Sequence, residues 1–140
     1  MRFMILVKAN PESEAGVLPS YDELAEMGKY NEELVKAGVL LAGEGLHPSS
    51  AGKRVRFDGS DRSVVDGPFG QTSELLAGFW LIQVKSPEEA VEWVKRIPFR
   101  EGEVEIRRVF EAEDFAPSDP TGELREAEER LRRQVEVAHA

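Results

Sequence analysis

The chain has 140 residues, 41% hydrophobic and 32% charged, and its 27 acidic and 18 basic residues give a net charge of -9. Such a chain suits one domain with a modest core. Its acidity argues against nucleic acid or an anionic membrane as a partner, because phosphate binding needs clustered positive charge. The absence of cysteine excludes disulfides, thiolate metal ligands and a cysteine nucleophile. No apolar run is long enough for a signal peptide or a membrane span, so a cytoplasmic location is expected.

Apolar periodicity and helix-capping residues predict the first elements. Residues 3–7 form an apolar run that is typical of a buried strand, and a loop is expected over 10–16. Ser20 and Glu23 make a capping box, which predicts a helix over 21–37 that ends at a glycine. The expected buried stripe of this helix has four members: Leu24, Met27, Leu34 and Val35.

Further strands are predicted in the middle of the chain. Residues 39–43 form a strand that the following glycines break, and residues 54–57 alternate in the manner of a half-exposed strand. The Asp-Gly-Ser-Asp sequence at 58–61 predicts a hairpin turn, with 63–65 as the returning strand. Residues 76–84 predict another core strand.

A second helix and a last strand follow. Ser86 is the expected N-cap, Pro87 takes the first helical position, and Glu89 closes a capping box. The expected buried stripe is Ala90, Val91, Val94 and Ile97. Residues 104–108 then alternate as a final strand.

The C-terminal tail is acidic. Residues 111–120 predict a linker, and 121–138 predict a charged helix with a narrow apolar face made of Leu124, Ala127, Leu131 and Val135. Such a stripe needs a partner to bury it. The expected division is therefore a domain over 1–115, with the linker and the amphipathic helix over 116–140.

The order of the predicted elements indicates a fold. Strand, helix, strand, hairpin, strand, helix, strand is the split β-α-β, or ferredoxin-like, arrangement with an inserted hairpin and an appended C-terminal helix. It is an α+β fold in which two helices cover one face of an antiparallel sheet. The open face predicts a homodimer with two sheets packed face to face.

His47 is the first candidate for chemistry. It is one of two histidines, and it lies at a strand end in the glycine-rich bend Gly43-Glu44-Gly45-Leu46-His47-Pro48. Histidine titrates near neutral pH, which suits general acid–base catalysis. The alternative is a structural histidine whose ring nitrogens satisfy nearby backbone groups.

Asp66 is the second candidate. It stands before Gly67-Pro68-Phe69, where an aspartate often only hydrogen-bonds the turn. If this turn and the bend with His47 meet at one end of the sheet, Asp66 would orient and charge the imidazole. Both interpretations of Asp66 stay open from the residues alone.

Other side chains qualify less strongly for a site. Glu44 is a further acid between glycines, and Tyr30, Arg54 and Arg56 are candidates for lining the pocket of an anionic small-molecule ligand. One histidine with one or two carboxylates falls short of the usual zinc ligand set, so no metal site is expected. The sequence shows no nucleotide-binding glycine loop, and no cofactor is expected.

These motifs together resemble the YCII-related proteins, in the branch that is named for its Asp-Gly-Pro-Phe sequence. The quoted bend at 43–48, the motif Asp66-Gly67-Pro68-Phe69 and the stretch Gly78-Phe79-Trp80-Leu81-Ile82 carry the resemblance. After the motif, Gly70, Gln71 and Ser73 replace the Ala, Glu and Lys of the family pattern. Two charges near the proposed cleft are thereby lost.

The resemblance implies a ferredoxin-like subunit and a dimeric α/β barrel. It also implies a cleft in which a His and an Asp act, and these roles fall on His47 and Asp66 by motif position. Members of the superfamily include lactone-processing dehalogenases, and some members of the branch occur beside alternative sigma factors. Two hypotheses follow: a cofactor-independent enzyme that uses the Asp66–His47 pair in lactone opening, elimination or proton transfer, or a non-catalytic ligand-binding or regulatory module.

Overall fold

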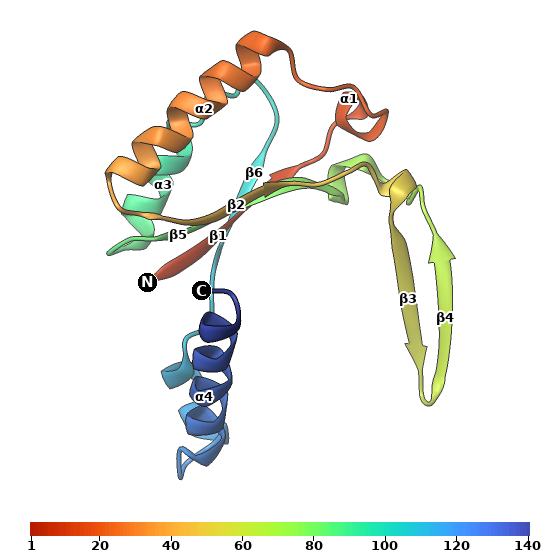
Figure 1. Ribbon diagram of the computed structural model, residues 1–140. Helices are drawn as coiled ribbons and strands as arrows, with labels where there is room; N and C mark the ends of the chain where they lie inside the picture. The colour runs from red at the N-terminus through yellow and green to blue at the C-terminus, as the bar shows by residue number, and fades with distance from the viewer. The chain divides into compact units, whose positions relative to one another are not determined.

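Four antiparallel strands form the main sheet of the computed structural model, which describes all 140 residues (Figure 1). Their order across the sheet is β2-β5-β1-β6, and each neighbouring pair is antiparallel, with register shifts between Val7 and Lys8 of β1 and between Leu40 and Ala42 of β2. The strands are β1 (Arg2–Lys8), β2 (Leu40–Gly45), β5 (Leu76–Gln83) and β6 (Val104–Arg108). This order is that of the ferredoxin-like arrangement, so the predicted α+β fold with an antiparallel sheet is confirmed.

Two helices, α2 (Tyr21–Lys36) and α3 (Pro87–Lys95), lie on the same face of the sheet (Figure 1). The capping box that opens α2 is present, because Ser20 and Glu23 each accept the other's backbone N–H. The box predicted for α3 is only half formed. Ser86 accepts the N–H of Glu89, but the Glu89 carboxylate accepts the N–H of Lys85, one residue before the N-cap.

The core lies between this face and the two helices. Its most buried side chains come from β1, β5, α2 and α3, and they include Phe3, Ile5, Tyr30, Leu34, Trp80, Ile82 and Ala90. Burial of this apolar surface is the main stabilising term of the fold. The predicted helix stripes are wrong in part. Leu24 and Val35 of α2, and Val91 of α3, are exposed, because each helix packs on the sheet through a narrower face than its apolar pattern suggests.

The predicted hairpin forms a separate two-stranded sheet of β3 (Lys53–Asp58) and β4 (Asp61–Asp66), joined at Gly59 and Ser60. Gly59 has a φ of +60°, which the tight turn requires. Two local predictions are wrong. β2 continues through the glycines at its end rather than breaking there, because β5 pairs with it up to Gly45. The loop after β1 contains the short helix α1 (Pro11–Glu14), capped by the Asn10 side chain.

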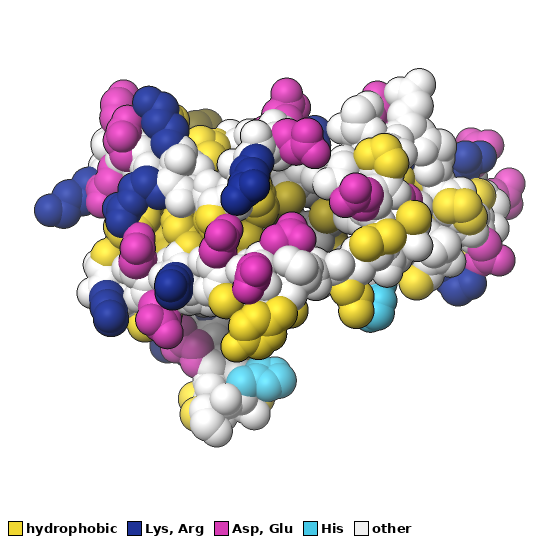
Figure 2. Space-filling model, turned by 90° about the horizontal axis from the view of Figure 1, so that it is seen from above, with side chains coloured by type: hydrophobic (Ala, Val, Ile, Leu, Met, Phe, Trp, Pro, Cys, Tyr) yellow, Lys and Arg dark blue, Asp and Glu magenta, His cyan; other side chains and the backbone are white.

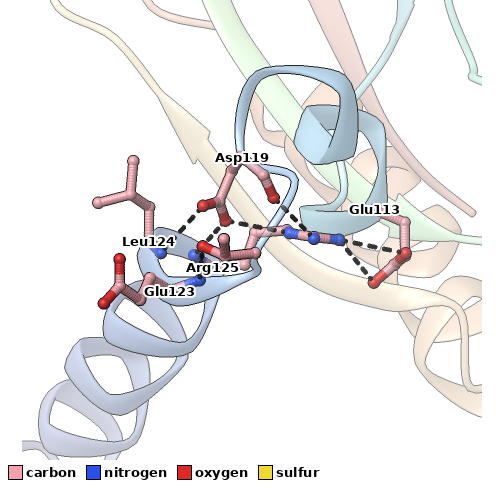
Figure 3. A network of polar contacts seen from close by, with 6 residues as sticks. Glu113, Asp119, Glu123, Leu124 and Arg125 are labelled. Atoms are coloured by element: carbon pink, nitrogen blue, oxygen red, sulfur yellow. Dashed lines mark hydrogen bonds and ion pairs between the residues drawn. The ribbon is translucent and has the colours of Figure 1, made fainter.

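Residues 110–140 form a compact unit that is distinct from the unit of residues 1–109. The stretch predicted as a linker is instead mostly a 3-10 helix over Ala112–Ser118, and it leads to helix α4 (Glu123–Ala138). The buried Asp119 carboxylate accepts the N–H groups of Leu124 and Arg125 and pairs with the Arg125 guanidinium at 3.2 Å (Figure 3). Burial alone raises the pKa of Asp119, but these hydrogen bonds outweigh burial and hold the pKa below its usual value.

Candidate functional site

The bend after β2 and the turn after β4 are bound to each other through Ser49. The Phe69 backbone N–H donates to Ser49 Oγ at 3.0 Å, and the Gly67 N–H donates to the Gly52 carbonyl at 3.0 Å. A Cβ atom on residue 67 would collide with the Ser49 carbonyl oxygen. The Asp-Gly-Pro-Phe motif therefore docks its backbone directly on the bend that carries His47.

Glu14 also holds Ser49 in place. Its two carboxylate oxygens accept the Ser49 hydroxyl at 2.5 Å and the Ser49 backbone N–H at 2.9 Å. These two hydrogen bonds, the one from the hydroxyl first, hold the pKa of Glu14 below its ordinary value. Three segments distant in sequence thus meet at one serine, which no pattern in the sequence had singled out.

The structure brings the segments of the two predicted catalytic residues together, but it does not join their side chains. Asp66 is the last residue of β4, and its carboxylate accepts a hydrogen bond from Lys53 Nζ at 2.5 Å across the hairpin. Both side chains of this pair are largely exposed, Asp66 at 74%. His47 is also exposed, and it makes no hydrogen bond or ion pair, with Asp66 or with any other residue.

The predicted ligand-binding residues occupy three different surroundings. The Tyr30 hydroxyl donates to the Trp93 carbonyl at 2.8 Å in the core, and burial raises the pKa of Tyr30 to about 12. The Arg54 guanidinium stacks over the Phe69 ring, 4.1 Å from its centroid. Glu44 borders a cavity.

This cavity has a volume of about 390 Å³ and lies between α2 and the part of the sheet formed by β2 and β5. Apolar side chains make up most of its lining. Three glycines of β2 and β5 also line it and contribute no side chain: Gly43, Gly45 and Gly78. Figure 2 looks down on the molecule from above and shows apolar side chains exposed between charged residues of both signs. The sequence analysis missed this cavity, although glycines in two strands that pair with each other could have indicated a space without side chains.

One polar group of the cavity has a fixed orientation. The indole Nε1–H of Trp80 donates to Asn31 Oδ1 at 2.9 Å. Because an indole N–H can only donate, the amide oxygen of Asn31 must face it, and the NH2 group points elsewhere. This NH2 group makes no hydrogen bond within the chain. Asn31, which lines the cavity, therefore has two amide hydrogens that are unpaired within the chain.

The protein is therefore a ferredoxin-like α+β protein with two features of note. The bend after β2 contacts the turn after β4, and a mainly apolar pocket lies beneath α2. The model of the YCII-related domain matches residues 1–113, and the chain belongs to that family. Its placement in the Asp-Gly-Pro-Phe branch stays a prediction.

The chain is also similar to two other proteins. It is 32% identical over 72 residues to an uncharacterised protein of Rhizobium meliloti (strain 1021), a match that spans 51% of this chain and 58% of that protein. It is 16% identical, with a TM-score of 0.41, to the 5-chloro-2-hydroxyhydroquinone dehydrochlorinase TftG of Burkholderia phenoliruptrix AC1100, solved with 2,5-dihydroxybenzoquinone. That match covers 79% of this chain and 94% of the dehydrochlorinase.

No three histidine, aspartate or glutamate side chains are grouped so that they could hold a metal ion. None of the helices combines the length and apolar character that crossing a bilayer requires.

Proposed function

We propose that this protein binds a small, mainly apolar molecule with a hydrogen-bond acceptor in the cavity beneath α2. The observation that carries the proposal is the NH2 group of Asn31, unpaired within the chain, in a mainly apolar cavity of about 390 Å³ that Glu44 also borders. Pockets of a few hundred Å³ with one or two oriented polar groups are typical of small-molecule sites. A carbonyl, phenol or lactone oxygen on the ligand would accept from Asn31, while the ring or chain packs on Trp80 and Phe99.

The two tryptophans allow a direct test. Acetophenone, which has a carbonyl acceptor, and ethylbenzene, which has none, are titrated into the ¹⁵N-labelled protein. We expect acetophenone to shift the indole N–H resonance of Trp80 and to leave that of Trp93, which does not line the cavity, in place. Ethylbenzene should bind roughly ten-fold more weakly, because the donor of Asn31 would be left unpaired. Equal shifts of both resonances, or of neither, would contradict the proposal.

Two variants separate the cavity from its polar group. Asn31→Asp keeps an oxygen for Trp80 but removes the NH2 donors, so acetophenone should lose its advantage over ethylbenzene. Gly45→Leu should fill the cavity and abolish binding of both probes, since a Cβ at residue 45 meets no atom within 4 Å. Gly70→Leu is the matched control, because residue 70 also has free space around its Cβ and does not line the cavity.

A second candidate function is acid–base catalysis by His47 and Asp66 on a small organic molecule. It is favoured by the direct docking of their two segments through Ser49 and Gly67. In lactone opening, His47 would take a proton from the attacking water and return it to the ring oxygen when the C–O bond breaks. Asp66 would exchange Lys53 for the imidazolium and stabilise its charge. This role requires Asp66 to leave its ion pair with Lys53. The variants His47→Ala and Asp66→Asn test whether the two residues take part in the reaction.

Hydrolysis of dihydrocoumarin, an aromatic lactone, tests this second proposal. Each of the two variants should lower the rate by about 100-fold or more, as loss of a general acid–base group does. His139→Ala is the control, because residue 139 is the other histidine of the chain and lies at the end of α4. A rate that equals the buffer reaction, or that survives both substitutions, would exclude the assignment.

A homodimer is also proposed, on the open face of the sheet. Met4, Leu6, Phe79 and Leu81 alternate with core residues along β1 and β5, and these four side chains stay partly exposed on the face without helices. Apolar side chains gathered on one face of a small protein indicate an interface. Sedimentation equilibrium of Leu6→Asp beside the parent chain tests it: the variant should associate more weakly than the parent, because its carboxylate would lie in the sheet interface, and equal association of the two chains would contradict the proposal.

A further inference from the structure

Helix α4 carries an apolar stripe that its own unit does not cover. Leu124, Leu131 and Val135 are 70%, 55% and 59% exposed, and they lie at helical spacing with Ala127 and Ala138. A helix of this length is marginal by itself and gains stability when such a stripe is buried. The stripe spans 124–138, so its midpoint is Leu131.

The charges of α4 are divided between its two halves. Residues 123–129 hold four glutamates and one arginine, whereas residues 130–138 hold three arginines and one glutamate. The single arginine of the first half, Arg125, is turned toward the preceding 3-10 helix, because Asp119 and Glu113 bind its guanidinium (Figure 3). The first half of α4 is therefore acidic along its free surface, and the second half is basic.

Interactions within the helix account for only part of this pattern. Acids near the N-terminus suit the helix dipole, and Glu128–Arg132 and Glu129–Arg133 form pairs four residues apart. Neither effect covers the apolar stripe. A partner with the reverse order of charges would bury the stripe and complement both halves.

We propose that α4 of one chain pairs antiparallel with α4 of a second copy, with the two Leu131 side chains at the centre. The antiparallel orientation sets each acidic half against a basic half, whereas a parallel pair would set like charges together. Alignment on Leu131 makes the two stripes overlap over their full length, with Leu124 of one copy beside Ala138 of the other. The helix thus acts as a self-recognition element, additional to any interface of the sheet.

The absence of cysteine allows a directional crosslinking test on the full chain. Leu124→Cys and Ala138→Cys are purified separately, mixed, and oxidised with a mild oxidant. We expect a crosslinked heterodimer in the mixture and no more than about a tenth as much product from either variant alone. Glu129→Cys, on the opposite face of α4, is the control and should not crosslink with either variant.

Other outcomes overturn the proposal. Efficient crosslinking of Leu124→Cys with itself would mean a parallel pair, and no crosslinking in the mixture would mean that α4 binds its own chain or another partner. A charge variant, with Arg130, Arg132 and Arg133 all changed to Glu, gives an independent measurement. It should form about ten-fold less crosslinked product when the two cysteines are placed in it, with circular dichroism confirming that the helix is retained.

Discussion

The carbonyl oxygen of Ser49 occupies the space that a side chain on residue 67 would need. Glycine at this position is therefore required by the contact between the bend after β2 and the turn after β4. Gly67 and Phe69 of the Asp-Gly-Pro-Phe motif therefore have structural roles that are independent of any role of Asp66.

Gly67→Ala should destabilise the protein by about 2 kcal/mol or more, because its Cβ would push apart two backbone segments that cannot move independently. Thermal unfolding followed by circular dichroism measures the effect. Gly70→Ala is the control and should change stability by less than about 0.5 kcal/mol, since its Cβ would meet nothing within 4 Å. Equal melting temperatures of the two variants would contradict the steric argument.

The hydrogen bonds of Glu14 should make stability depend on pH. Its pKa lies below the ordinary value of 4.5 in the folded chain, so protonation favours the unfolded chain. The stabilisation is complete above this ordinary value and disappears as the pH falls through the lower, folded-state pKa. We expect the difference in melting temperature between the parent and Glu14→Gln to be constant from pH 7 to about 5 and to shrink below that. Glu12→Gln, which removes a nearby carboxylate that makes no such bonds, is the control variant.

Adjacent residues of α2 should differ in their contribution to the core. Leu34 is 1% exposed and Val35 is 62% exposed. Leu34→Ala should lower the free energy of unfolding by about 2–5 kcal/mol, because it leaves a cavity in the core. Val35→Ala should change it by less than about 0.5 kcal/mol. Urea denaturation of both variants decides whether α2 packs through the face that the structure shows.

Asp119 should control the start of α4. Asp119→Ala removes the acceptor of the Leu124 and Arg125 N–H groups, so the first turn of α4 should open more often. Hydrogen exchange detected by mass spectrometry should show amides in this turn exchanging roughly five-fold faster or more. Glu129→Ala, which removes only an exposed pair with Arg133, should leave exchange there unchanged. An unaltered first turn in Asp119→Ala would show that the carboxylate is not its cap.

The sequence by itself determined the order of the elements, the caps of α2 and the hairpin turn at Gly59, because these depend on local periodicity and on the conformational preferences of single residues. Only the tertiary structure decided which apolar residues of α2 face the core, and that the stretch expected as a linker over 111–120 contains the 3-10 helix Ala112–Ser118, followed by the buried Asp119. The tertiary structure alone also decided the cavity beside Asn31 and the contact of Gly67 with Ser49. They arise where segments far apart in the chain meet, and the geometry of such contacts is set by the packing of the whole sheet and its helices, which no local pattern encodes.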